Sequence, residues 1–163
     1  DAGRWDFDPL EEETSPIKLS REQISLTDLL YDMSWRYKHQ ADKSDIIITH
    51  DFQPSYLEIN ADEEMMERAV SNILSNAVRY AKHSITIRLR ESDDTVTILI
   101  AHNGESISPD QINDIFERFY KGAKGQYGIG LAMAEDIITR YGGTLQVLST
   151  YEETCFEIVL PNN

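Results

Sequence analysis

The chain reads SNILSNAVRYA from Ser71 to Ala81, and this stretch decides the fold because it places an apolar and a polar stripe on one helix. We expect the helix to begin after Asp62, an N-cap residue that two glutamates follow, and no Gly or Pro interrupts it before Ala81. Its apolar residues recur at helical spacing and predict a buried stripe made of Met66, Ala69, Val70, Ile73, Leu74, Ala77 and Ala81.

The polar stripe lies along one edge of the apolar stripe and consists of Asn72, Asn76, Arg79 and Tyr80. Asn is unfavourable inside a helix because its amide competes with the backbone for hydrogen bonds. Two asparagines one turn apart, beside an Arg and a Tyr, therefore indicate a binding site. The alternative is a solvated helix face with incidental polar residues.

Composition and charge narrow the classes of function. The 163 residues suffice for one domain with a sizeable core, and 40% of them are hydrophobic. The net charge of -14 argues against nucleic acid or an anionic membrane surface as the main partner. The single Cys155 rules out an internal disulfide framework and fits a reducing cytosol. No apolar run approaches the ~20 residues that a membrane-spanning helix needs.

The first 20 residues differ from the rest of the chain. They are acidic and contain two prolines, so we expect a linker there and one folded domain over residues 21–163. Since the chain opens at Asp1 rather than Met, we expect it to be a piece of a longer protein.

Strands and helices are expected to alternate along the domain. Further helices are predicted over residues 27–41, from Ser108, and over 128–141, where two glycines end the last one. Several predicted strands are joined as hairpins, so we expect an α/β fold with one mixed sheet covered by helices. These strands are predicted over residues 45–51, 56–59, 84–91, 95–102, 144–150 and 155–160.

Three further segments carry chemistry together with the polar stripe: residues 100–109 (IAHNGESISP), 115–122 (IFERFYKG) and 127–134 (YGIGLAMA). In the last segment glycines open a helix, so free backbone N–H groups and the positive end of the helix dipole predict a phosphate site. The alternative is a pair of glycines needed only for packing. The positive charge that a triphosphate needs is present in Arg79, Lys121 and Lys124, and Asn76 offers an oxygen suited to Mg²⁺.

These four segments, in this order and at this spacing, resemble the N, G1, F and G2 boxes of the catalytic ATP-binding domain of bacterial two-component sensor histidine kinases. The resemblance covers roughly residues 20–161, and residues 1–5 are similar to the end of the second helix of that family's dimerisation hairpin. It implies a two-layer α/β sandwich, the Bergerat-type ATP-binding fold, in which three helices cover a mixed, mostly antiparallel sheet. It also implies ATP and Mg²⁺ as cofactors.

The resemblance also implies a set of site residues. Asn76 matches the family's Mg²⁺ ligand, the other residues of the polar stripe line the phosphates and adenine, and Thr154 reaches the adenine region through water. Phe116 and Phe119 anchor a lid, short here, and residues 120–127 are expected to order when nucleotide binds; the alternative is a surface loop with solvated lysines. The implied ATP-binding residues are Asn72, Asn76, Arg79, Tyr80, His102, Gly104, Ile107, Phe119, Tyr120, Lys121, Lys124, Gly128, Ile129, Gly130, Leu131 and Thr154.

The G1 segment departs from the family's Asp-x-Gly-x-Gly pattern, because His102 replaces the Asp and Ser106 replaces the second Gly. The family's Asp accepts a hydrogen bond from the adenine amino group, whereas a neutral imidazole accepts with one nitrogen only. A charge-assisted bond contributes about 1.5–3 kcal/mol against ~1 kcal/mol for a neutral one. We therefore expect adenine binding to weaken by roughly tenfold or more, unless His102 simply caps the strand end.

Two absences narrow the expected mechanism. The ATP-hydrolysing branches of the superfamily carry a general-base Glu where this chain has Asn72, so hydrolysis should be slow. None of His39, His50, His83 and His102 has the sequence context of the family's phosphoacceptor. The resemblance therefore implies transfer of the ATP γ-phosphoryl group to a histidine upstream of Asp1, and the isolated chain is expected to bind nucleotide without phosphorylating itself.

The implied partners are the upstream dimerisation and phosphoacceptor domain of the same protein and a response regulator, with no nucleic acid. We expect this fragment to be a monomer and the full-length protein a homodimer. We also expect the chain to be a cytoplasmic domain of a sensor protein in the inner or plasma membrane. Three alternatives remain open: a regulatory nucleotide-sensing module of the same fold, an ATPase of the gyrase or chaperone type, and a soluble protein-serine kinase of the anti-sigma-factor kind.

Overall fold

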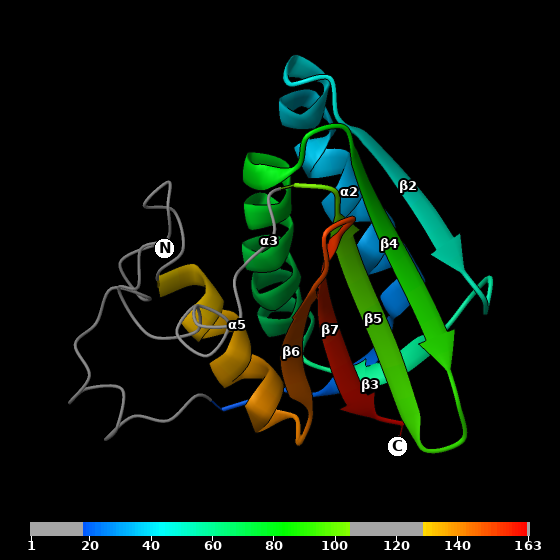
Figure 1. Cartoon of the computed structure of the whole chain (residues 1–163). Helices are drawn as coiled ribbons and strands as arrows, with labels where there is room; N and C mark the ends of the chain where they lie inside the picture. Colours follow the sequence, from blue (N-terminus) through cyan, green and yellow to red (C-terminus); the bar gives the residue numbers. More distant parts are fainter. Residues whose placement is uncertain (1–17, 105–128, 163) are drawn as a thin grey trace.

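A computed structural model describes residues 18–104 and 129–162, which form seven strands and three helices (Figure 1). The predicted linker and preceding helix end, the helix from Ser108 and the loop over residues 121–127 lie outside the described residues. No helix in the described ranges has the length and apolar character needed to cross a membrane.

The three helices begin and end close to where the sequence predicts them. Helix α2 runs over Leu26–Lys43 and α3 over Glu63–Tyr80, while α5 runs over Ile129–Arg140. The N-cap prediction for α3 is confirmed, because Asp62 Oδ1 accepts a hydrogen bond from the Met65 N–H at 3.1 Å. Each predicted apolar residue from Met66 to Ala77 is fully buried, and Ala81 packs half-buried against the same core.

Five strands form one mixed sheet in the order β2-β4-β5-β7-β6. The edge strand β2 pairs in parallel with β4, and the other neighbours are antiparallel. The expected hairpins are present, since the Ser92 N–H bonds to the Thr95 carbonyl between β4 and β5. The five strands are β2 (Ile47–Phe52), β4 (Ser84–Glu91), β5 (Thr95–His102), β6 (Thr144–Ser149) and β7 (Thr154–Pro161).

The core lies between this sheet and the helices, which cover one of its faces (Figure 1). Alternate residues of β4 and β5 are fully buried, and the residues between them are mostly half-buried, as expected for a sheet covered on one side. The predicted two-layer α/β architecture with three helices on a mostly antiparallel sheet is therefore confirmed for the described residues.

A second, two-stranded sheet was not predicted. Strand β1 (Glu22–Ser25) pairs antiparallel with β3 (Glu58–Ala61), apart from the larger sheet. Only Ile24 of the four residues of β1 is buried. A strand this short therefore shows no alternation of apolar and polar residues from which it could be predicted.

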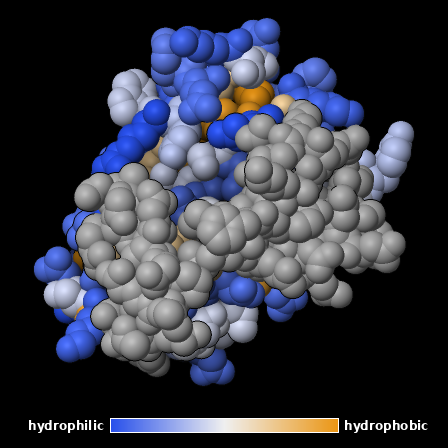
Figure 2. All heavy atoms as spheres, turned by 90° about the vertical axis from the view of Figure 1, so that its left-hand side faces the viewer, coloured by the Kyte–Doolittle hydropathy of each residue, from blue (hydrophilic) through white to orange (hydrophobic). Residues whose placement is uncertain are grey.

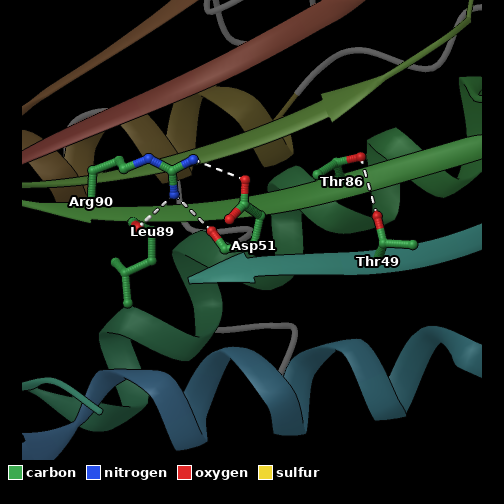
Figure 3. A network of polar contacts seen from close by, with 5 residues as sticks. All are labelled: Thr49, Asp51, Thr86, Leu89 and Arg90. Atoms are coloured by element: carbon green, nitrogen blue, oxygen red, sulfur yellow. Dashed lines mark hydrogen bonds and ion pairs between the residues drawn. The ribbon is translucent and has the colours of Figure 1, made fainter. Parts of the chain in front are cut away.

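The parallel edge strand β2 is tied to β4 by side chains as well as by backbone pairing (Figure 3). The Arg90 guanidinium donates to the Asp51 carbonyl at 2.8 Å and to the Asp51 carboxylate at 2.9 Å, and it also reaches the Leu89 carbonyl. At the same pair of strands the hydroxyls of Thr49 and Thr86 lie 3.3 Å apart.

Tyr141, the residue after α5, joins the end of that helix to the start of α3 through hydrogen bonds. Its buried hydroxyl accepts from the Asp62 N–H at 2.9 Å and donates to the Asp62 carbonyl at 3.0 Å. Burial raises the pKa of this phenol, so the hydroxyl stays protonated and keeps its donor role. The Asp62 carboxylate also accepts from the Ser20 N–H, which brings the chain before β1 to the same point.

We predict that Tyr141→Phe lowers the free energy of unfolding by about 1–3 kcal/mol, because it leaves the buried Asp62 N–H without its partner and removes one of the two hydrogen bonds that the Asp62 carbonyl accepts. Urea unfolding followed by circular dichroism measures the change. Tyr56→Phe is the matched control, since the Tyr56 hydroxyl donates to Glu58 on the exposed surface, and its effect should stay within about 0.5 kcal/mol. Equal effects of the two substitutions would contradict this role for Tyr141.

Candidate functional site

The polar stripe of α3 is not a solvated face. The side chains of Asn76 and Tyr80 are each only 7% exposed, and Asn72 is half-buried, while Arg79 is exposed. Buried polar side chains in a helix require hydrogen-bond partners or a ligand. The stripe therefore lies at a junction between α3 and neighbouring elements.

The amide of Asn76 is fixed in one orientation by its own helix. Its Nδ2 donates to the Asn72 carbonyl at 3.0 Å, one turn earlier, and the Ser75 hydroxyl donates to the same carbonyl. Within the described part of the chain no hydrogen bond reaches Asn76 Oδ1. The oxygen therefore keeps its lone pairs for a ligand, as a hard cation requires.

The first turn of α5 lies beside Asn72. A Cβ placed on Gly130 would lie 3.8 Å from Cβ and Cγ of Asn72, which is ordinary van der Waals contact. The start of this helix, where N–H groups lack partners within the helix, is thus adjacent to the polar stripe. Leu131 is fully buried and anchors the turn to the core.

The end of β5 contacts the other end of the stripe. A Cβ on Gly104 would lie only 2.1 Å from the Tyr80 carbonyl oxygen, so only glycine fits this approach of β5 to the last turn of α3.

The preceding residue, Asn103, holds the same junction together. Its Oδ1 accepts hydrogen bonds from the N–H groups of Lys82, His83 and Ser84 at 2.9–3.1 Å. These residues connect α3 to β4, so one side chain joins the end of α3, the start of β4 and the end of β5. Sequence reasoning missed this role; an Asn directly before a turn glycine was the available signal.

His102 is buried at the end of β5, with 2% of its surface exposed. Its Nδ1 accepts a hydrogen bond from the Gly104 N–H at 3.0 Å. Burial lowers the pKa of the ring to about 4, so at neutral pH the ring is uncharged and its proton sits on Nε2. The Nδ1 nitrogen is therefore already used by the turn that follows β5, and the contact of His102 with adenine stays a prediction.

Thr154 lies opposite His102 on the neighbouring strand β7. Its side chain is fully buried, and its hydroxyl lies 2.8 Å from that of Ser149. The His102 ring stacks on Phe156, with 6.4 Å between ring centroids. His102, Thr154 and Phe156 thus form a small wall at one end of the sheet.

Most of the predicted site residues that the structure describes lie on α3 or at its contacts with β5 and α5, and Arg79 lies on α3 with an exposed side chain: the others are Asn72, Asn76, Tyr80, His102, Gly104, Gly130, Leu131 and Thr154. For Ile129 it describes only the position in α5. Another group of predicted site residues lies outside the described residues: Ile107, Phe119, Tyr120, Lys121, Lys124 and Gly128. On the face in Figure 2, the described residues are mainly hydrophilic, and apolar atoms show only in a small area.

Comparisons with known proteins, by family, by sequence and by structure, agree on one family. Residues 61–163 match the family described as histidine kinase-, DNA gyrase B-, and HSP90-like ATPase. The heme sensor protein HssS of Staphylococcus aureus (strain Newman) is 33% identical over 147 residues, which are 87% of this chain and 32% of HssS. The chain thus spans about a third of the length of that curated relative.

Two solved structures extend the likeness. The mycobacterial sensor histidine kinase MprB is 26% identical, with a TM-score of 0.77 over 88% of this chain and 98% of the MprB chain. The histidine kinase ThkA, solved in complex with the response regulator protein TrrA, shares the fold with a TM-score of 0.82 at 18% identity. That match covers 94% of this chain and 45% of the ThkA chain.

Two glycine substitutions should separate the two ends of the site. Gly104→Ala should lower the free energy of unfolding by about 3 kcal/mol or more, because the new methyl group meets the rigid Tyr80 carbonyl. Gly130→Ala should change it by less than about 1 kcal/mol, since its methyl group meets Asn72 at ordinary contact distance. Denaturant unfolding measures both, and a Gly104→Ala protein as stable as Gly130→Ala would refute this account of the junction.

His102 should also make stability depend on pH. The unfolded ring takes up its proton near pH 6.5 and the folded ring near pH 4, so the unfolded state binds more protons between these values. Stability should therefore fall as the pH drops from 6.5 to 4, by about 2–3 kcal/mol from this group. Urea unfolding across this range should show a shallower fall for His102→Asn than for the wild type, and parallel profiles would contradict the buried, neutral ring.

Proposed function

The chain belongs to the histidine kinase-, DNA gyrase B-, and HSP90-like ATPase family, and from this premise we propose that it is the ATP-binding catalytic domain of a sensor histidine kinase. In this proposal it positions ATP for transfer of the γ-phosphoryl group to a histidine on a dimerisation domain of the same protein. The similarity to HssS and MprB supports the kinase branch of the family.

The residues of the described site fit a nucleotide with its metal ion. The observation that carries the proposal is the Asn76 amide, whose nitrogen is held by the Asn72 carbonyl while its oxygen has no partner among the described residues. This oxygen would hold Mg²⁺, which supplies charge neutralisation between the phosphates. The start of α5, beside Asn72, would receive phosphate oxygens on its free N–H groups.

The chain's own residues position the substrate rather than react with it. Asn72, half-buried one turn before Asn76, is an amide that cannot take a proton from water at neutral pH. Nor is His102 suited to this, since its accepting nitrogen is bonded to the Gly104 N–H. With neither group able to activate water, hydrolysis stays slow and the phosphoryl group is kept for a protein acceptor.

The described histidines also favour an acceptor elsewhere in the protein. His102 is buried, and His50 is half-buried with its Nε2 bonded to Ser34 at 2.7 Å. The remaining two, His39 near the end of α2 and His83 just before β4, are exposed. We therefore place the phosphoacceptor in the dimerisation domain.

The proposal extends to partners and location. A response regulator would take the phosphoryl group from the dimerisation domain, as the complex of ThkA with TrrA supports. The full-length protein would be a homodimer, with this domain on the cytoplasmic side of a membrane-anchored sensor. The net charge of -14 speaks against nucleic acid as a partner.

Calorimetric titration with ATP, with and without Mg²⁺, tests the proposal. Wild type should bind ATP more tightly with Mg²⁺, and Asn76→Ala should lose about tenfold or more of its affinity only when Mg²⁺ is present. Gln40→Ala, an exposed polar residue on α2, serves as the control and should bind like the wild type. Equal losses with and without Mg²⁺ would remove Asn76 as the metal ligand, and no binding by the wild type would overturn the proposed function.

A further inference from the structure

A cavity of about 550 Å³ lies between helix α2 and the edge strand β2, and none of its lining residues belongs to the predicted nucleotide site. It is termed the α2–β2 groove, and its lining residues include Tyr31, Asp32, Trp35, Lys38, Ile47 and His50. Trp35 is 74% exposed and Tyr31 is 47% exposed, although both side chains are large and aromatic. Aromatic side chains left exposed beside an apolar hollow are typical of a surface that binds a partner.

Hydrogen bonds and ring contacts hold one side of the groove in place. The Ser34 hydroxyl donates to the Leu30 carbonyl at 2.9 Å, so at His50 it accepts, from the Nε2–H at 2.7 Å. The His50 ring in turn packs against the rings of Tyr31 and Phe52, with 4.7 and 5.5 Å between centroids. The groove therefore exists before a partner binds, which lowers the entropy that binding must overcome.

The outer edge of β2 carries backbone groups without a strand to pair with. Among the described strands β2 pairs only with β4, and it runs along the outer edge of the sheet (Figure 1). The N–H groups of Ile47 and Gln53 donate to carbonyls on the β4 side at 2.9 and 3.0 Å. Successive residues of a strand direct their backbone groups to opposite sides, so Ile48, His50 and Phe52 direct theirs outward. Such a row is a template for another strand.

The charges of the groove favour a basic occupant. Three charged side chains line it, and Lys38 Nζ pairs with the Asp42 carboxylate at 2.8 Å. The Asp32 carboxylate has no ion pair in the described part of the chain, which leaves the groove with one negative charge in excess. A second copy of this chain is a poor occupant, because each copy has a net charge of -14 and brings its own Asp32 to the shared edge.

We propose that β2 and the α2–β2 groove bind an extended basic segment of a partner protein, which adds to the five-stranded sheet beyond β2. The backbone of that segment pairs with the outward N–H and C=O groups of Ile48, His50 and Phe52. Its apolar side chains lie in the groove, and an Arg or Lys meets Asp32. This binding needs no nucleotide, so it is independent of the proposed function.

Amide hydrogen exchange in the chain alone tests whether the edge is open. The Ile48, His50 and Phe52 amides should exchange about tenfold or more faster than those of Thr49 and Asp51, which face β4. NMR of the labelled wild-type protein resolves the five amides separately. Equal protection of both sets would mean that the edge is already covered, and the inference would then be wrong.

Titration of the whole chain with synthetic peptides tests the occupant. The probe is Thr-Val-Thr-Arg-Thr-Val-Thr with blocked ends, whose Val and Arg side chains share one face of a strand. It should shift the NMR signals of β2 and α2 and should slow exchange of the Ile48, His50 and Phe52 amides. The same peptide methylated at every backbone nitrogen has no donors, and it should bind about tenfold more weakly or not at all.

A charge exchange tests the role of Asp32. Wild type should bind the Arg peptide about threefold or more tighter than the matching peptide with Glu in its place. Asp32→Lys should reverse this preference. The control is Asp93→Lys, which makes the same change of charge in the exposed β4–β5 turn and should keep the wild-type preference. A preference that Asp32→Lys leaves unchanged would contradict the basic chemistry of the occupant.

Trp35→Ala tests the groove itself and should weaken binding of the Arg peptide by about fivefold or more. Tyr151→Ala is the control, since Tyr151 is an aromatic side chain exposed in the β6–β7 turn, and it should bind like the wild type. Failure of the wild type to bind either peptide would overturn the inference. So would dimers of the chain that protect Ile48, His50 and Phe52, because the edge would then belong to a second copy. Neither result bears on nucleotide binding.

Discussion

The domain depends on one close approach, between the carbonyl of Tyr80 at the end of α3 and the backbone of Gly104 at the end of β5. Because a Cβ there would sit 2.1 Å from the carbonyl oxygen, the approach admits only glycine. Asn103, next to it, gathers the three N–H groups that lead into β4. The same turn fixes the His102 ring through the Gly104 N–H. Helix α3, the sheet and the buried His102 ring thus share one point of attachment.

Starting from this contact, α3 spaces the predicted site residues one helical turn apart. Tyr80 meets β5, Asn76 lies one turn back with its oxygen available, and Asn72 meets the first turn of α5 one turn further. The eight residues from Asn72 to Tyr80 span about 12 Å of helix. In the proposed function, the metal and phosphate positions would therefore be set along a single rigid helix.

The elements that local signals govern were predictable. The N-cap at Asp62 and the hairpin turn at residues 92–94 set the bounds of α3, β4 and β5, and the structure reproduces them within a residue. The pairing of β1 with β3 was not predictable, because its stability comes from residues distant in sequence. The site shows the same division. The residue types on α3 could be read from the sequence. The hydrogen bond that His102 Nδ1 accepts from its own turn, and the three that Asn103 accepts, could not. Such bonds depend on how side chains meet after the chain has folded.

The parallel edge strand implies an order of assembly. The β4–β5 and β6–β7 pairs each close over a turn of a few residues, whereas β2 reaches β4 only across β3 and the whole of α3. Closing a long loop costs conformational entropy before such a distant contact can form. The two hairpins should therefore form early and β2 should dock late. During synthesis β2 emerges before its partner and must remain unpaired until α3 and β4 have followed it. The Arg90–Asp51 contact would then form last, after both hairpins, and would hold the edge strand β2 on the sheet.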